Sequence, residues 1–147
     1  SEKHLAQLIA RLNRPYIRYS ACNAPAPPAE ILIIDNVGML NTLYRYGAAA
    51  FIGGGFGKGI HNTLEPAAFG LPVLFGPRFE KFEEARQLVA RGGAFVIRDS
   101  ADLTAVMKNL EDTAFYQQTS RAARAYLEES RGATERILQY LASVRWF

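Results

Sequence analysis

Apolar residues recur in this sequence with two different spacings. Leu5, Leu8, Ile9 and Leu12 follow helical spacing, whereas residues 31–34 are apolar without interruption, which is typical of a buried parallel strand. The pattern predicts strands over residues 16–19, 31–34, 48–52, 72–75 and 94–97. It predicts helices from the start of the chain to before Pro15, and over residues 38–46, 63–69, 82–91, 101–110 and about 114–145, the last with a break near Gly132.

Short apolar strands that alternate with helices predict an α/β fold with a Rossmann-like, doubly wound parallel sheet. The first predicted element is a helix, although such a domain ordinarily begins with its central strand. We therefore expect a domain that lacks its first strand. An open sheet edge of this kind favours self-association of the chain.

Composition narrows the class of protein. With 147 residues, 49% of them hydrophobic, we expect a single soluble domain, and no stretch approaches the roughly 20 apolar residues of a membrane span. The net charge of +3 is spread over several helices, which argues against a nucleic-acid-binding stripe. Cys22 is the only cysteine, so an internal disulfide is excluded and a reducing compartment is favoured.

The most informative segment is glycine-rich and follows the strand predicted over residues 48–52. Five glycines lie between positions 53 and 59, among them Gly54 and Gly55, and a short helix follows. Backbone amides can approach a ligand there, at the carboxyl end of the sheet, and the helix N-terminus suits a phosphate or a sugar carboxylate. The spacing matches neither a Walker A loop nor a dinucleotide fingerprint, so a ligand-free turn stays an alternative.

Asn62 and Glu65 stand three positions apart where this helix begins. In one interpretation Asn62 caps the helix and Glu65 closes a capping box. In the other, Glu65 accepts hydrogen bonds from the two hydroxyls of a ribose, while Asn62 and nearby amides hold a phosphate. The pattern alone does not choose between them.

Other polar residues near these loops have two interpretations each. His61 suits a structural hydrogen bond or a contact to a departing phosphate. Lys58 can neutralise a phosphate or remain solvated, and Arg78 and Lys81 are expected on the solvated surface in preference to a cleft.

A second candidate loop follows residues 31–34. Asp35 or Asn36 can cap the next helix, while Gly38 permits backbone amides to reach a base or a phosphate. We expect this loop and the glycine-rich loop to follow neighbouring strands and to converge on one cleft. The sequence contains no Ser-His-Asp set, paired carboxylates or Cys-His cluster, so it predicts a binding domain without catalytic residues and without a metal site.

The order of residues around the glycine-rich loop resembles a known signature. His61-Asn62-Thr63-Leu64-Glu65-Pro66-Ala67, then Gly70-Leu71-Pro72-Val73 and Gly76-Pro77, is similar to the Gly-Gly-His-Asn-x-Leu-Glu-Pro-Ala-x-x-Gly-x-Pro-Val-x-x-Gly-Pro signature of the 3-deoxy-D-manno-octulosonate (Kdo) transferases of lipopolysaccharide biosynthesis. Upstream, Asp35-Asn36-Val37-Gly38-Met39-Leu40 resembles the loop of the same family, with Met39 where the family usually has Glu.

The resemblance implies a GT-B glycosyltransferase of two Rossmann-like domains, of which this chain is the C-terminal, CMP-Kdo-binding one. Transfer of Kdo from CMP-Kdo to a lipid A precursor proceeds in that family with inversion and without a cofactor. The residues that match donor-binding positions are Val37, Gly38, Met39, Gly54, Gly55, His61, Asn62, Thr63, Leu64 and Glu65.

The same resemblance places the catalytic base and the acceptor surface in an N-terminal domain, so this fragment alone is expected to be inactive. It places the full-length protein at the cytoplasmic face of the inner membrane. Two alternatives stay open: the donor domain of a glycosyltransferase or epimerase that uses a UDP-sugar, and a non-catalytic Rossmann-like interaction domain.

Overall fold

The structure is a computed structural model that describes residues 2–22, 27–130 and 132–144. The chain divides into two compact units, a first unit of residues 1–42 and a second unit of residues 43–147. Positions 131 and 145 of the helical region predicted over residues 114–145 lie outside the described residues. None of the described helices combines the length and the apolar character needed to cross a bilayer.

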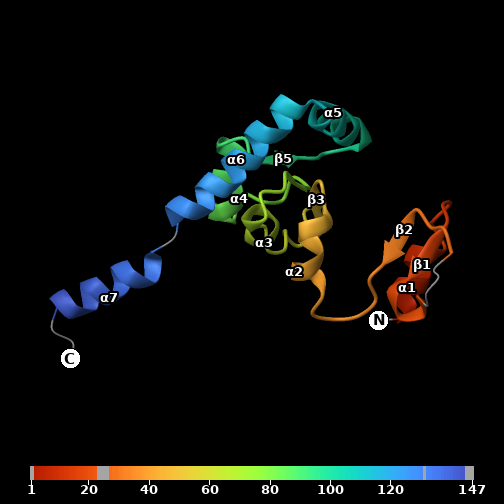
Figure 1. Cartoon of the computed structure of the whole chain (residues 1–147), viewed down its shortest axis with the longest axis horizontal. Coiled ribbons are helices and arrows are strands. Elements are labelled where there is room, and N and C mark those ends of the chain that lie inside the picture. Colours follow the sequence, from red (N-terminus) through yellow and green to blue (C-terminus); the bar gives the residue numbers. More distant parts are fainter. Residues whose placement is uncertain (1, 23–26, 131, 145–147) are drawn as a thin grey trace. The chain divides into compact units, whose positions relative to one another are not determined.

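The first unit contains a parallel pair of strands. Its elements are α1 (Glu2–Ile9), β1 (Tyr16–Arg18), the 3-10 helix η1 (Tyr19–Ala21) and β2 (Ile31–Ile33) (Figure 1). Ile17 lies opposite Leu32 in the pairing of β1 with β2. Parallel strands need a crossover connection, which residues 19–30 supply here. The described part of this connection, residues 19–22 and 27–30, contains no α-helix.

Asp35, which follows β2, is bonded to the other strand of this pair. Its carboxylate accepts hydrogen bonds from Arg18 Nε at 2.7 Å, from the Ser20 hydroxyl at 2.5 Å and from the Ser20 amide at 3.0 Å. These hydrogen bonds hold the pKa of Asp35 well below its usual range, and the bond from the Ser20 hydroxyl has the largest effect. Asp35 therefore joins β1 to β2 and does not act as the cap of the following helix.

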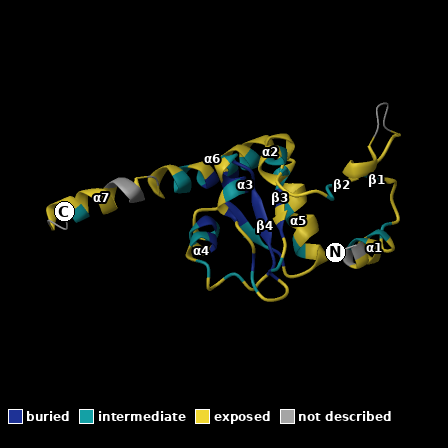
Figure 2. Cartoon of the chain, turned by 90° about the horizontal axis from the view of Figure 1, so that it is seen from below, coloured by how far each residue is buried: buried dark blue, intermediate teal, exposed yellow. Residues whose placement is uncertain are grey.

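The second unit is built on a sheet of three parallel strands. These are β3 (Ala50–Ile52), β4 (Val73–Phe75) and β5 (Ala94–Val96), in the order β3-β4-β5. Val73 lies opposite Ala50 on one side and opposite Ala94 on the other. Every residue of β4 is buried, as expected for a central strand covered on both faces, and Figure 2 shows buried residues gathered in and around it.

Helices separate and follow these strands. α2 (Leu40–Leu43), which contains the boundary between the units, and the 3-10 helix η2 (Tyr44–Tyr46) precede β3; α3 (Leu64–Ala68) and α4 (Glu83–Ala90) connect the strands; α5 (Ser100–Leu110), α6 (Thr113–Ser130) and α7 (Ala133–Ser143) follow β5. α6 packs against α3, α4 and α5. The hydrophobic core comprises Ala50, Ile52, Ile60, Ala67, Leu71, Val73, Phe75, Ala85, Leu88, Ala94 and Ala123.

The end of α3 is fixed by α6. Gly70 follows α3 with φ +71°, a left-handed conformation that glycine adopts without strain, and Arg124 Nη2 donates a hydrogen bond of 3.1 Å to the Phe69 carbonyl. This contact spans 55 positions of sequence. It positions α3, and with it the residues at the start of α3, relative to the body of the second unit.

Most predicted elements are found within a few residues of their expected bounds, and the α/β class is confirmed. The helix predicted over residues 38–46 is instead a short α-helix followed by a 3-10 turn, and strand 16–19 gives way to a 3-10 turn at Tyr19. The break near Gly132 is present, with φ +86° at that glycine. β2 pairs with β1 in the first unit and β3 pairs with β4 in the second. The expectation that the two candidate loops follow neighbouring strands remains a prediction.

Candidate functional site

Two loops of the second unit leave the same edge of the sheet. β3 and β4 are parallel, so residues 53–63, which follow β3, and residues 76–82, which follow β4, both begin at the carboxyl edge. This is the edge at which open α/β sheets bind ligands. We call residues 53–59 the glycine-rich loop.

The glycine-rich loop is closed on its own carbonyl groups. The amides of Gly57 and Gly59 both donate to the Gly54 carbonyl, at 2.8 Å and 3.2 Å, and Gly54 and Gly59 have φ of +90° and +133°. The His61 amide donates to the Gly53 carbonyl at 3.3 Å. Three amides that the sequence offered to a ligand are therefore used within this segment.

Gly55 is a packing residue. It is buried, and a Cβ atom placed on it would lie 2.5 Å from the Gly76 amide nitrogen, closer than real side chains approach a backbone. A Cβ atom on Gly76 would lie 2.6 Å from the Gly55 carbonyl carbon. The two glycines allow the loops after β3 and β4 to meet backbone to backbone.

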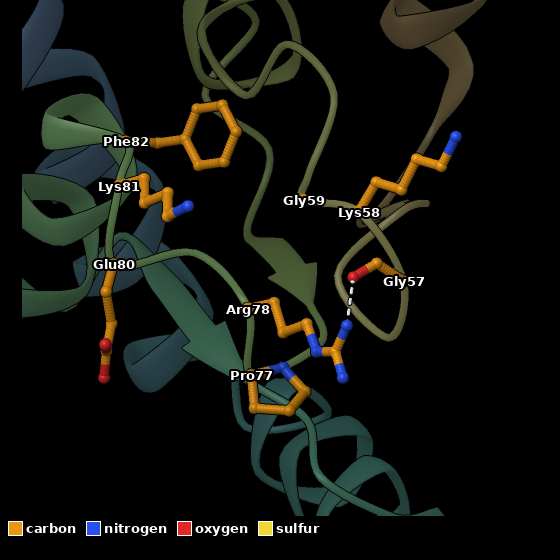
Figure 3. A pocket seen from close by; sticks show the side chains of 8 residues that line it. All are labelled: Gly57, Lys58, Gly59, Pro77, Arg78, Glu80, Lys81 and Phe82. Carbon is orange, nitrogen blue, oxygen red and sulfur yellow. Dashed lines mark hydrogen bonds between the residues drawn. The ribbon is translucent and has the colours of Figure 1, made fainter.

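Arg78, in the loop that follows β4, is hydrogen-bonded to the glycine-rich loop and holds it in place. Its amide donates to the Gly55 carbonyl at 2.9 Å, and its Nη1 donates to the Gly57 carbonyl at 2.6 Å (Figure 3). Arg78 is exposed, as expected, and its side chain is in addition bound to the loop. A guanidinium suits this role because it offers several donors in a fixed plane.

Asn62 holds Glu65. Asn62 Nδ2 donates to Glu65 Oε1 at 3.0 Å, while Asn62 Oδ1 accepts from the Leu64 amide at 2.9 Å. The geometry is not that of a capping box, because the carboxylate of Glu65 accepts from a side chain and not from a backbone amide of the first turn. The side-chain amide of Asn62 therefore binds the backbone where α3 begins and also orients the half-exposed carboxylate of Glu65.

Tyr44 is an electrostatic neighbour of Glu65. Burial raises the pKa of the Tyr44 hydroxyl, and the negative charge of Glu65 raises it further, by a smaller amount. The ring of Tyr44 is tilted against Phe69 at a centroid distance of 6.1 Å. Tyr44 was not among the predicted site residues. The motif spacing gave no signal for it, because it lies in the 3-10 turn before β3.

The remaining predicted residues of the second unit differ in exposure. Thr63 is 1% exposed, and its Oγ1 has no hydrogen-bond partner among the described residues. Leu64 and His61 are exposed, and no hydrogen bond joins the His61 imidazole to another described residue. The structure thus brings His61, Asn62, Thr63 and Glu65 together at the carboxyl edge. Among them, the Glu65 carboxylate is held by the side chain of Asn62.

Val37, Gly38 and Met39 lie in the first unit. Val37 is fully exposed, Gly38 has φ +96°, and Met39 Sδ accepts from Asn36 Nδ2 at 2.9 Å. The convergence of this loop with the glycine-rich loop remains a prediction. Within the described residues, no three His, Cys, Asp or Glu side chains gather as a set of metal ligands.

A cavity of about 350 Å³ lies between the loops that follow β3 and β4. Its lining includes the backbone of the glycine-rich loop together with Arg78, Lys81 and Phe82, and we call it the basic cavity (Figure 3). Lys81 is exposed, as expected, and it also lines this cavity.

Comparisons with known proteins identify relatives along nearly the whole chain. The 3-deoxy-D-manno-octulosonic acid transferase of Haemophilus influenzae is 33% identical over an alignment of 141 residues that covers 93% of this chain and 33% of the relative. The enzyme of the same name from Bordetella pertussis is 35% identical over an alignment of 130 residues that covers 86% of this chain and 30% of the relative. No family model matches the chain.

A solved structure shares the fold. The C-terminal CMP-Kdo binding domain of WaaA from Acinetobacter baumannii superposes with a TM-score of 0.74 at 21% identity, covering 85% of this chain and 67% of that one. The Rossmann-like α/β class is thereby confirmed. The chain is a relative of the 3-deoxy-D-manno-octulosonic acid transferases and spans about a third of their length.

Proposed function

We propose that this chain is the donor-binding part of a glycosyltransferase that moves Kdo from CMP-Kdo to a lipid A precursor. The observation that carries the proposal is the Glu65 carboxylate, held by Asn62 at 3.0 Å at the carboxyl edge of the sheet. Both residues belong to the segment whose order resembles the Kdo transferase signature. The shared fold with a CMP-Kdo binding domain supports the same donor.

The carboxylate of Glu65 would bind the ribose of CMP. An ionised carboxylate is acceptor-only, so it accepts from both hydroxyls of a ribose. Asn62 already donates to Oε1, which fixes the plane of the carboxylate before the ligand arrives. Pre-organisation of this kind strengthens binding because less side-chain freedom is lost when the ligand is bound.

The donor's phosphate is the part that leaves in the transfer reaction. We assign it to the exposed backbone and side chains around His61 and Asn62, beside the ribose-binding carboxylate. Holding the departing CMP stabilises charge that develops during the reaction, which is how a binding domain lowers the barrier. Val37, Gly38 and Met39 are assigned to the same nucleotide on the strength of their sequence resemblance.

Further parts of the proposal concern the whole protein. By the same resemblance, the lipid A precursor and the catalytic base are assigned to an N-terminal domain, and the full-length enzyme to the cytoplasmic face of the inner membrane. This chain by itself is expected to bind the donor without turning it over. Its self-association through open strand edges is tested by measuring its mass in solution.

The ribose contact is tested by pairing a variant with a ligand that lacks one hydroxyl. CMP and 2′-deoxy-CMP are titrated by calorimetry into the chain and into Glu65→Ala, with Glu111→Ala as the control for loss of a surface carboxylate. We expect the missing hydroxyl to weaken binding by about tenfold in the chain and in the control, and by less than about twofold in Glu65→Ala. An equal loss in all three proteins would mean that Glu65 does not bind the ribose.

A further inference from the structure

The basic cavity has three walls of different chemistry. The glycine-rich loop contributes backbone at Gly57 and Gly59, the segment after β4 contributes Arg78 and Lys81, and Phe82 contributes an aromatic ring. A Cβ atom on Gly59 would lie 3.0 Å from the ring of Phe82, so the glycine lets the ring close against the loop. All of these residues belong to the second unit.

The charge of the cavity is positive. Figure 3 shows the Lys81 side chain directed into the space beside Phe82, whereas the Glu80 carboxylate and the Lys58 ammonium point away from it. Arg78 is bound to a neutral carbonyl, so its charge is not compensated there. No described carboxylate forms an ion pair with Arg78 or Lys81.

The size and the apolar wall select a ligand larger than a single ion. A volume of about 350 Å³ lies in the range of small-molecule sites. The ring of Phe82 offers an apolar face that suits the C–H groups of a sugar, while Lys81 offers a compact charge with three donors. A sugar that carries its own carboxylate combines these two requirements.

We propose that the basic cavity holds the sugar of the donor, with the sugar carboxylate bound by the Lys81 ammonium and the sugar ring against Phe82. The inference rests on the proposed function, since it assigns the acidic sugar to one cavity and leaves the nucleotide on Asn62 and Glu65. Arg78 acts here as a positioning residue that shapes the cavity by fastening the glycine-rich loop. A charge-assisted hydrogen bond to a carboxylate gives Lys81 its selectivity for the acid over a neutral sugar.

The test compares Lys81, whose side chain points into the cavity, with Lys58, whose side chain points away from it. With CMP present at saturation, free Kdo and its neutral methyl ester are titrated into the chain, into Lys81→Gln and into the matched control Lys58→Gln. CMP alone is titrated into all three, and far-UV circular dichroism checks their fold. We expect Lys81→Gln to weaken the binding of Kdo by about tenfold and that of the ester by less than about twofold. Lys58→Gln should change the binding of each ligand by less than about twofold, since the Lys58 ammonium points away from the cavity.

Three results would overturn the assignment. Equal binding of Kdo by Lys81→Gln and the unmodified chain would show that Lys81 does not bind the sugar carboxylate. A loss of CMP binding in Lys81→Gln with Kdo unaffected would show that the cavity holds a phosphate. Binding of CMP by a chain that does not bind Kdo at all would also contradict the proposal while leaving the nucleotide site intact. By contrast, failure of the unmodified chain to bind CMP would count against the proposed function itself.

Discussion

Gly55 and Gly76 pack backbone to backbone, so that a methyl group on Gly55 would lie 2.5 Å from the Gly76 amide nitrogen. The contact joins the glycine-rich loop to the loop after β4 and sets the shape of the carboxyl edge. We predict that Gly55→Ala lowers the free energy of unfolding by about 2 kcal/mol, because the overlap forces the backbone to shift. Urea unfolding followed by circular dichroism measures the effect.

Gly57→Ala is the control for that substitution. Its methyl group would find its nearest neighbour, the Gly54 carbonyl oxygen, at 3.6 Å, which is ordinary contact. We expect a change in the free energy of unfolding below about 1 kcal/mol in this variant. Equal destabilisation by the two substitutions would show that the packing against Gly76 is not what requires a glycine.

Arg78 is predicted to order the glycine-rich loop without contributing much to global stability. Arg78→Ala removes the hydrogen bond to the Gly57 carbonyl, so the amides of Gly57 and Gly59 should exchange with solvent about tenfold faster. Hydrogen exchange by NMR measures this rate. Arg86→Ala removes a surface arginine that forms an ion pair with Glu83, and it should leave the loop unchanged. Unaltered exchange in Arg78→Ala would contradict the fastening role.

Asn62→Asp separates the two roles of Asn62. The aspartate keeps an oxygen for the Leu64 amide but loses the Nδ2 donor to Glu65, and it adds a like charge beside that carboxylate. We expect stability within about 1 kcal/mol of the unmodified chain and a roughly tenfold loss of CMP affinity. Unchanged CMP affinity, with the fold intact, would show that orientation of Glu65 by Asn62 does not matter for binding.

The sequence predicted the fold closely because its strands are short apolar runs bounded by turns. β4 is the clearest case, since Val73–Phe75 is fully buried and lies within the run expected over residues 72–75. The prediction was less complete at η1 and η2, where short helical turns replace parts of the expected elements. Periodicity carries no information that distinguishes a 3-10 turn from the end of a helix.

At the site, local spacing was informative and long-range contacts were not. The interval between Asn62 and Glu65 placed both where α3 begins, and the two side chains are hydrogen-bonded to each other there. The hydrogen bond from Arg78 to Gly57 spans 21 positions, and no motif indicates it. The pairing of Gly55 with Gly76 was also missed, because each glycine alone fits a simple turn.

Asp35 makes the stability of the chain depend on pH. Its pKa is lowered by hydrogen bonds from Ser20 and Arg18, so its contribution is present above the unfolded-state pKa of about 4 and is lost as the pH falls toward the folded-state value. Asp35→Asn should therefore lower the thermal midpoint at pH 7 and have a smaller effect near pH 3. Glu111→Gln serves as the control, with little effect at either pH. An Asp35→Asn effect that is equal at both pH values would contradict the ionised role of Asp35.

The most direct test of the proposed function is a comparison of CMP with UMP as ligands of the unmodified chain, by calorimetry on a sample shown to be folded by circular dichroism. The two nucleotides share the ribose and the phosphate, so the comparison isolates the choice of base. We predict that CMP binds at least about tenfold more tightly than UMP. UMP binding as tight as or tighter than that of CMP would contradict a CMP-Kdo donor and favour a UDP-sugar, and binding of neither would contradict a nucleotide site in this chain.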